Sequence, residues 1–391
     1  MIFVHLCWLL ILSIGNTELL VTLINRTHAF PVHERLLKPL RHLHDVLIPL
    51  VPLWILIVVG FFSPGVFLQS TTPREAWSQL STPVAGYFSL CLIGFAGFLF
   101  SVARHWLRRV PRQQVSFESQ IVDVAAEVGE SLAGHGTYRS LLRVPFNECF
   151  TVEWTERELA LPRLPREWDG VTLLHLTDLH FTGTPDLPFY EAICNRAKML
   201  DFDIAVFTGD LIDDENCLEW IPRTLGQIEA PLGQYFILGN HDWYHEVPVV
   251  RQELTAAGWR DLGGQVQLLD TAGKKLAIGG DERPWLGKGP NFAAAPPDAF
   301  RLLLSHTPDN LSWARRQGVD LMLAGHNHGG QVVLPGIGPV YSPSFHGTKF
   351  AGGLYWHDPT LLFVNRGLGG RHPLRIGARP EVSRITLRTA E

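Results

Sequence analysis

The chain has 391 residues, more than one average domain, which predicts two units or one domain with a large appendage. Its formal net charge is −5 and its sequence pI is about 6.4, which argues against long nucleic acid as a partner because such binding needs a basic face. The five cysteines form no C-x-x-C pair, so reduced thiols are expected rather than a disulfide framework or a thiolate zinc site.

Apolar runs in the first third of the chain predict membrane-spanning helices. Residues 84–103 contain no charge and are long enough to cross ~30 Å of hydrocarbon. Residues 46–68 are also uncharged, although three prolines should kink them. Residues 2–24 are the weakest candidate because Asn16 and Glu18 interrupt them. They lack a basic n-region and a clear cleavage site, so a retained helix is favoured over a signal peptide, which stays the alternative.

Basic residues beside these segments predict their orientation. The first loop contains Arg26, Arg35, Lys38 and Arg41, the second contains Arg74, and the third segment is followed by Arg104, Arg108, Arg109 and Arg112. Because cytoplasmic loops carry the excess of Lys and Arg, we expect a multi-pass protein of the cell (inner) membrane with its C-terminal part in the cytoplasm. The predicted division is a transmembrane helical region over 1–112 and a second domain over 113–391.

From about residue 115 the pattern changes to short apolar runs between polar, Gly- and Pro-rich turns. Five runs of four to six residues suit strands buried on both faces: Val171–Leu176, Asp203–Phe207, Tyr235–Leu238, Arg301–Leu304 and Asp320–Leu323. Expected helices at 189–200 and 217–227 separate the first three, an order typical of parallel βαβ units. Shorter strands, expected at 331–334, 354–357, 361–365 and 382–388, would form a mixed or antiparallel second sheet. Residues 115–124 and 156–161 are expected to add strands before the core.

Each of the five main runs is followed by residues of the types that bind metal ions. In chain order these are Asp178 and His180; Asp210, with Asp213 and Asp214 close by; Asn240, His241 and Asp242; His306; and His326 and His328. Functional groups gather beyond the carboxyl ends of strands in open α/β sheets. We therefore expect five neighbouring strand ends to bring these side chains into one crevice.

The donor set predicts two divalent metal ions. Carboxylate, amide oxygen and imidazole together suit Mn²⁺, Fe²⁺ or Zn²⁺. Seven donors are too many for one ion that keeps a position open for substrate, but they suffice for two ions that share a bridging carboxylate. Paired ions ~3.5–4 Å apart are the usual device for in-line displacement at phosphorus.

The order D-x-H, G-D-x-x-D, G-N-H-D, H and G-H-x-H resembles that of the calcineurin-like metallophosphoesterases, over about residues 165–391. The stretches GHNHGGQ at 325–331, KFAGGLY at 349–355 and NRGLG at 365–369 resemble a subgroup of bacterial membrane-associated phosphodiesterases. Some members of that subgroup hydrolyse UDP-2,3-diacylglucosamine. The middle residue of G-H-x-H is commonly Thr there and is Asn327 here, a position that binds no metal in the family.

The resemblance implies an α/β fold, a sandwich of two mixed sheets flanked by helices (αββα), after the transmembrane region. It also implies a role for each site residue. Asp178, His180 and His328 would hold one ion, Asn240, His306 and His326 the other, and Asp210 would bridge them. His241 would stabilise the transition state or protonate the leaving oxygen, and Asp242 would orient its imidazole.

Other polar residues keep two interpretations. Asp213 and Asp214 are expected to cap a helix start, with a contact to a site residue as the alternative. Arg366, Arg371 and His372 lie near the expected site and are candidates for binding a second phosphate of the substrate, although surface arginines are common.

The predicted function is hydrolysis of a phosphodiester or pyrophosphate bond by in-line attack of a metal-bridging hydroxide. The expected partners are the lipid bilayer and a phosphorylated lipid or lipid-linked nucleotide such as UDP-2,3-diacylglucosamine; no protein partner can be inferred. A nuclease or cyclic-nucleotide phosphodiesterase on the same site is the alternative. A non-catalytic scaffold is disfavoured because the donor set is complete.

Overall fold

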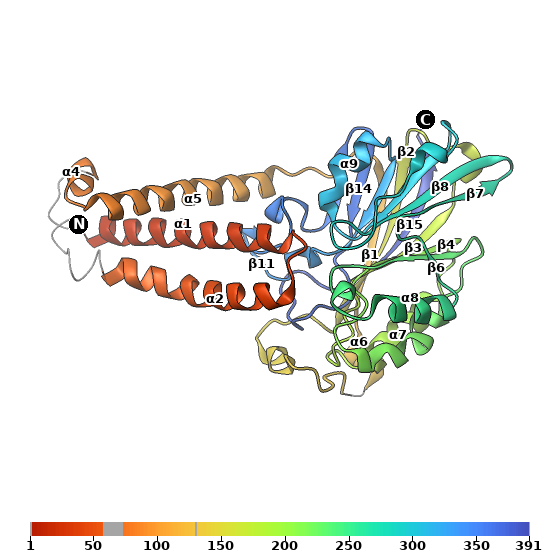
Figure 1. Ribbon diagram of the computed structural model, residues 1–391, viewed down its shortest axis with the longest axis horizontal. Coiled ribbons are helices and arrows are strands. Elements are labelled where there is room, and N and C mark those ends of the chain that lie inside the picture. The colour runs from red at the N-terminus through yellow and green to blue at the C-terminus, as the bar shows by residue number, and fades with distance from the viewer. Residues whose placement is uncertain (1, 58–72, 130, 391) are drawn as a thin grey trace. The chain divides into compact units, whose positions relative to one another are not determined.

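The computed structural model describes residues 2–57, 73–129 and 131–390 (Figure 1). The chain divides into two compact units, Met1–Arg108 with Gly336–Gly338, and Arg109–Pro335 with Pro339–Glu391. The first unit is helical and the second contains both large sheets. The expected division into a transmembrane region over 1–112 and a second domain over 113–391 stays a prediction.

The first unit contains four described helices: α1 (Ile2–His28), α2 (Glu34–Ile57), α4 (Pro73–Ser78) and α5 (Thr82–Leu107). Two segments, Leu6–His28 and Thr82–Leu107, are long and apolar enough to cross a membrane, which supports membrane association. The expected segment 46–68 overlaps α2 as far as Ile57, and the rest of it lies outside the described residues.

Small residues allow α1 and α5 to pack closely. A Cβ atom added at Gly15 would lie 1.8 Å from the carbonyl oxygen of Cys91, and one added at Gly94 would lie 2.2 Å from the carbonyl oxygen of Gly15. Such close approach is typical of helices that associate in membranes. Asn16, which interrupts the apolar run of α1, is buried and accepts a hydrogen bond of 2.6 Å from the Tyr87 hydroxyl.

The second unit is built on two large sheets. The seven-stranded sheet has the order β1 (Gln114–Asp123), β2 (Thr151–Leu161), β15 (Glu381–Thr389), β3 (Thr172–Leu176), β4 (Ile204–Thr208), β5 (Gln234–Ile237) and β6 (Arg260–Asp261). The six-stranded sheet has the order β13 (Gly353–His357), β14 (Thr360–Val364), β10 (Leu321–Ala324), β9 (Phe300–Ser305), β8 (Lys274–Asp281) and β7 (Val266–Thr271). Two short strands, β11 (Val333–Leu334) and β12 (Gly338–Pro339), lie outside both sheets.

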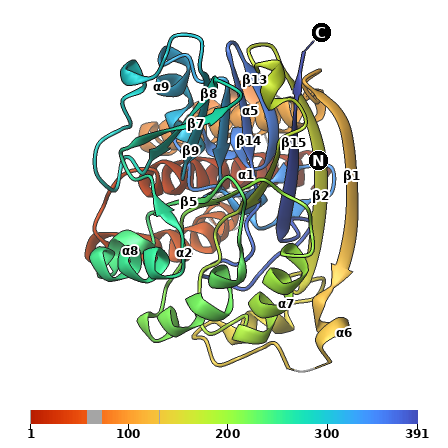
Figure 2. The same cartoon turned by 90° about the vertical axis from the view of Figure 1, so that its right-hand side faces the viewer.

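The two sheets pack face to face and helices cover their outer faces, as the resemblance implied (Figure 2). Leu173 and Ile204 of the first sheet share one buried cluster with Leu302 and Leu323 of the second. Helices α7 (Leu187–Ala197) and α8 (Val247–Ala256) pack on the outer face of the first sheet, and α9 (Leu311–Arg316) packs on that of the second. Strands covered on both faces are buried throughout, which explains the uninterrupted apolar runs.

The strand pairing confirms some expectations and corrects others. Strands β3, β4 and β5 are parallel, as are β9 and β10. The expectation that all five are neighbours in one sheet is wrong, because three belong to the first sheet and two to the second. The C-terminal strands form no separate sheet either: β13 and β14 extend the second sheet, while β15 lies between β2 and β3 of the first. Apolar periodicity indicates where a strand lies but not which sheet it joins.

The expected helix at 217–227 is also wrong in type. The structure has two 3₁₀ helices there, η4 (Glu215–Arg223) and η5 (Leu225–Gln227). Pro222 lies inside η4, and its missing N–H cannot take part in an α-helical ladder.

Candidate functional site

The predicted metal ligands lie at the carboxyl ends of strands from both sheets. Asp178 and His180 follow β3, Asp210 follows β4, His306 follows β9, and His326 and His328 follow β10. Five of these residues have a left-handed backbone, with φ of 51° at Asp178, 48° at His180, 58° at Asp210, 69° at His326 and 50° at His328. Left-handed conformations in residues other than glycine are uncommon and concentrate at functional sites.

Two glycines make room for the carboxylates of this site. A Cβ atom at Gly325 would lie 2.2 Å from Oδ2 of Asp178, and one at Gly239 would lie 2.2 Å from Oδ1 of Asp210. No side chain fits at either position without moving a carboxylate. These glycines therefore stand beside the predicted ligands for a steric reason.

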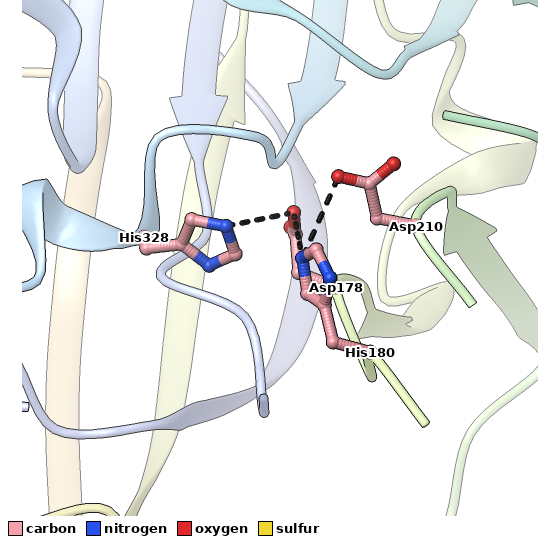
Figure 3. Close-up of side chains that lie close together, drawn as sticks. All are labelled: Asp178, His180, Asp210 and His328. Carbon is pink, nitrogen blue, oxygen red and sulfur yellow. Dashed lines mark ion pairs between the residues drawn. The ribbon is translucent and has the colours of Figure 1, made fainter. Parts of the chain in front are cut away.

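The first cluster consists of Asp178, His180, Asp210 and His328, all buried (Figure 3). The Nε2 atom of His180 lies 3.8 Å from Oδ1 of Asp178 and 3.5 Å from Oδ2 of Asp210. The Nε2 atom of His328 lies 3.7 Å from Oδ1 of Asp178. The donor atoms of this cluster all lie within 4.8 Å of one another, so one cation could contact them together.

The second cluster consists of Asp210, His306 and His326, with Asn240 beside them. The Nε2 atom of His306 lies 3.3 Å from Oδ2 of Asp210, 3.0 Å from Oδ1 of Asn240 and 3.1 Å from Nδ1 of His326. Asp210 is thus common to both clusters. The structure brings all seven predicted ligands together at the edge of the two sheets.

The donor atoms fit divalent cations. Nε2 of His180 and Oδ2 of Asp210 are buried and have no hydrogen-bond partner. Buried polar atoms are rarely left unpaired, and an ion is one of the usual reasons when they are. The facing ring nitrogens of His306 and His326 would likewise be satisfied by a cation between them.

Three of the four predicted ligand histidines have their outer ring nitrogen held by an acceptor. Nδ1 of His180 lies 2.7 Å from Oδ2 of Asp213, and Nδ1 of His306 lies 2.8 Å from the carbonyl oxygen of Thr208. Nε2 of His326 lies 2.7 Å from the carbonyl oxygen of Pro343. Since each outer nitrogen donates, the inner nitrogen keeps its lone pair for a metal ion, the usual arrangement around ligating histidines.

The pKa values of His180 and His306 reflect the carboxylates around them. Burial disfavours the charged form of His180, but the carboxylates of Asp213, Asp178 and Asp210 outweigh it and raise its pKa to about 10. Burial also opposes the charge on His306, yet Asp210 raises its pKa to about 9. In the absence of a cation His180 and His306 therefore attract protons, which a bound metal ion would displace. The other two ligand candidates behave differently, because burial lowers the pKa of His326 to about 3 and that of His328 well below its ordinary value.

A second carboxylate connects His180 to His241. Asp213 places Oδ2 at 2.7 Å from Nδ1 of His180 and Oδ1 at 2.5 Å from Nδ1 of His241. Burial would raise the pKa of Asp213, but the two imidazoles hold it well below its ordinary value. The side chain of His241 is 17% exposed, whereas that of His180 is fully buried, so solvent and substrate can reach His241.

Comparison with known proteins agrees with this geometry. Residues 171–330 match the calcineurin-like phosphoesterase family. The chain is 32% identical over 252 residues to the uncharacterized metallophosphoesterase YkuE of Bacillus subtilis, a match that covers 62% of this chain and 87% of YkuE. The chain belongs to the calcineurin-like phosphoesterases. It is therefore a hydrolase whose clustered Asp and His side chains suit divalent metals.

Two further relatives carry a named activity. The phosphodiesterase YaeI of Escherichia coli is 26% identical over 222 residues, which cover 55% of this chain and 81% of YaeI. The UDP-2,3-diacylglucosamine pyrophosphatase LpxG of Chlamydia muridarum is 27% identical over 293 residues, which cover 56% of this chain and 85% of LpxG. Both named activities cleave phosphate esters or anhydrides, the chemistry of this phosphoesterase family.

The structure corrects the expected partner of His241 in this phosphoesterase. Asp213, not Asp242, contacts the imidazole. Of the two residues expected to cap a helix start, Asp214 does so and accepts a hydrogen bond of 3.0 Å from the backbone N–H of Asn216 at the start of η4, whereas Asp213 makes the alternative contact with site residues. Asp213 is the second aspartate of the G-D-x-x-D motif, so this motif already contained the residue that contacts His241.

Asp242 has a structural environment. Its fully buried carboxylate accepts hydrogen bonds from the backbone N–H groups of Gly239 (2.8 Å), Asp210 (3.0 Å), Leu211 (2.8 Å) and Ile212 (3.2 Å). It joins the loop after β4 to the loop after β5, both of which present metal-type ligands. The expected contact with the His241 ring is absent among the described hydrogen bonds, because the turn directs this side chain inward.

Asp242→Ala is expected to destabilise the protein by about 3 kcal/mol or more, since several buried N–H groups would lose their acceptor. Thermal unfolding of the detergent-solubilised full chain measures the effect. The matched variant Asp213→Asn should unfold close to wild type and lose activity instead. Full stability of Asp242→Ala together with lost turnover would return Asp242 to a catalytic role.

The candidate phosphate-binding residues have other partners. Arg366 places Nε at 3.0 Å from Oε2 of Glu381 and Nη2 at 2.9 Å from Oε2 of Glu153, so its charge is already neutralised and the proposed role in binding substrate is not supported. The ring of His372 packs against that of Tyr138, with centroids 4.4 Å apart. Arg371 is half-buried next to it, and its role stays a prediction.

Two residues of the site escaped the sequence analysis. Arg375 is almost fully buried and donates to the carbonyl oxygens of His328 (3.1 Å) and Arg366 (2.8 Å), and its Nη2 lies 3.3 Å from Nδ1 of His328. Trp285 packs against both His306 and His326, with ring centroids 5.7 and 5.0 Å apart. Neither residue type stands out in a motif, so only the fold reveals these contacts.

Proposed function

We propose that the protein hydrolyses phosphodiester or pyrophosphate bonds with two divalent metal ions. The observation that carries this proposal is the position of Asp210, which belongs to both donor clusters. Its Oδ2 atom is buried, has no hydrogen-bond partner, and lies 3.5 Å from Nε2 of His180 and 3.3 Å from Nε2 of His306. Asp178, His180 and His328 would hold one ion and Asn240, His306 and His326 the other, with Asp210 between them. When bound, such ions stabilise charge on the phosphoryl group and acidify a water molecule.

The residues of the chain supply the proton. Asp213 accepts the Nδ1–H of His241, which fixes the ring and leaves Nε2 to donate to the leaving oxygen. His241 is thus the residue of the chain that would pass a proton to the leaving oxygen. Its partial exposure allows the contact, while the buried ligand histidines are shielded from substrate.

The proposed substrate is a membrane lipid or lipid-linked nucleotide such as UDP-2,3-diacylglucosamine. Two candidate membrane-spanning helices and the similarity to LpxG support this class. We also propose that residues 1–112 form a multi-pass membrane region of the cell (inner) membrane. The distribution of basic residues supports a cytoplasmic position for the catalytic domain over 113–391.

Chelator-treated full-length protein is expected to lose hydrolysis of bis(p-nitrophenyl) phosphate and to regain it with Mn²⁺, Fe²⁺ or Zn²⁺. Metal analysis of the active protein should give two ions per chain, because the donors form two overlapping clusters. No turnover with any of these ions, or full activity with a single ion, would contradict the proposal. A panel of UDP-2,3-diacylglucosamine, phospholipids, single-stranded DNA and cyclic nucleotides then separates lipid hydrolase from nuclease or cyclic-nucleotide phosphodiesterase.

A further inference from the structure

A surface lobe over residues 135–147 projects from the catalytic unit between α6 (Val124–Val128) and β2 (the yellow loop to the left of α6 in Figure 1). It contains the short 3₁₀ helix η2 (Arg139–Arg143), none of whose residues is buried. Tyr138 is 36% exposed and Phe146 is 87% exposed. Phe146 also has a left-handed backbone with φ of 64°, which is rare for a bulky side chain. The fold therefore keeps two aromatic rings at the surface and accepts backbone strain at one of them.

The lobe is fastened at both ends. At its start, the backbone N–H groups of His135 and Gly136 donate to the carbonyl oxygen of Gly183. At its end, the Asn147 amide donates to the carbonyl oxygen of Pro373 at 2.8 Å, and its Oδ1 atom accepts from the backbone N–H of Arg375 at 2.9 Å. The exposed residues in the middle of the lobe are thus held between two hydrogen-bonded ends.

The charge of the lobe is positive in an otherwise acidic chain. It contains Arg139 and Arg143 but no Asp or Glu, while the whole chain carries −5. Both arginines are exposed, and neither pairs with an acidic side chain among the residues that the structure describes. Unpaired arginines beside exposed aromatic rings match the interface of an anionic bilayer, where rings lie at head-group level and basic groups meet lipid phosphates.

The lobe is also connected to the candidate active site. Tyr138 packs against His372, and Asn147 binds the backbone of Arg375. The guanidinium of Arg375 in turn donates to the carbonyl oxygen of the predicted metal ligand His328. A continuous series of hydrogen bonds, part-buried at Asn147 and buried at Arg375, thus joins the lobe to the turn that carries His328.

We propose that the 135–147 lobe binds the surface of an anionic membrane and presents the active site to phosphate esters of lipids. The bilayer is favoured as the partner because the same chain carries two candidate membrane-spanning helices, and only β1 and α6 separate the second of them from the lobe. The preference for lipid substrates rests on the proposed function. The membrane contact itself does not, so the two can be tested separately.

Hydrogen exchange tests the contact without reference to activity. The full-length protein is placed in nanodiscs of phosphatidylcholine alone or mixed with phosphatidylglycerol. Amides of residues 137–147 should exchange more slowly in the anionic discs, and Arg139→Glu/Arg143→Glu should remove the difference while Phe146→Ser reduces it. The control Arg166→Glu/Arg316→Glu makes the same charge change at two exposed arginines outside the lobe, and Arg166 follows the opposite end of β2. Equal exchange of the lobe in both kinds of disc, with β3 protected in each, would overturn the proposal.

Hydrolysis assays test whether contact of the lobe with the membrane promotes turnover of lipid substrates. In anionic proteoliposomes, Arg139→Glu/Arg143→Glu should lower turnover of UDP-2,3-diacylglucosamine by about tenfold or more, since each basic residue near such a surface contributes several-fold to binding. Turnover of soluble bis(p-nitrophenyl) phosphate should not change, which also shows that the variant is folded. An equal loss on both substrates, or on neither, would contradict a role in lipid access. Absence of turnover in the wild type would instead refute the proposed function and leave the exchange result standing.

Discussion

His241→Ala is expected to lower kcat by a factor of about 10²–10⁴, the usual contribution of a positioned acid or base. His241 is the partly exposed member of the histidine cluster, and Asp213 holds its Nδ1 atom at 2.5 Å. Removal of the ring leaves both donor clusters intact, so the metal content should stay at two ions per chain. Steady-state kinetics together with metal analysis measures the two quantities.

The choice of leaving group provides the control for this variant. A phenolate of low pKa departs without a proton, so the loss should be small for a nitrophenyl ester and large for an alkyl or sugar phosphate. Asp213→Asn should show the same dependence on the leaving group to a smaller extent, because the ring stays present but is no longer held by a charge. Equal losses on good and poor leaving groups would exclude His241 as the acid.

Asp210→Asn is expected to reduce kcat/KM by more than about 100-fold. This exceeds the usual loss when a residue that only hydrogen-bonds to a metal ligand is replaced. Oδ2 of Asp210 lies 3.5 Å from Nε2 of His180 and 3.3 Å from Nε2 of His306, between the two clusters. A neutral amide balances less cationic charge, so at least one ion should be lost. Oδ1 of Asp210 accepts the backbone N–H of His241, a bond that Asn can still accept, so the fold should persist.

Elemental analysis and kinetics on Asp210→Asn check this expectation. Asp214→Asn is the matched control, since it makes the same chemical change four residues later at a helix cap that tolerates Asn. The control should retain two ions and wild-type turnover. Two ions and normal turnover in Asp210→Asn would remove the basis for a shared carboxylate.

The clustering of the predicted ligands could be anticipated because each of them follows a local pattern. A buried strand followed by Asp, Asn or His can be recognised within a few residues, and the family motifs repeat that pattern in a fixed order. The assignment of strands to two sheets was not predictable in this way. It depends on the packing of residues such as Leu173 and Leu302, from different sheets, into one buried cluster, which no period in the sequence encodes.

The hydrogen-bond and ion-pair partners of the site residues could not be predicted from local sequence either. Asp242 stands next to His241 in sequence, but the backbone turn directs its carboxylate to four N–H groups, whereas Asp213 reaches His241 from 28 residues away. Arg366 was a candidate for binding phosphate because it lies near the expected site. Its partner Glu153 is 213 residues away in sequence, so nothing in the local sequence indicated this ion pair. Adjacency in sequence is thus a poor guide to side-chain partners where loops from different strands meet.

The shared carboxylate of Asp213 makes the position of His241 depend on that of His180. Oδ2 of Asp213 lies 2.7 Å from Nδ1 of His180, and Oδ1 lies 2.5 Å from Nδ1 of His241. Because one rigid carboxylate holds both rings, a displacement of His180 would also displace or turn the ring of His241. A protein built in this way aligns its proton donor together with a predicted metal ligand.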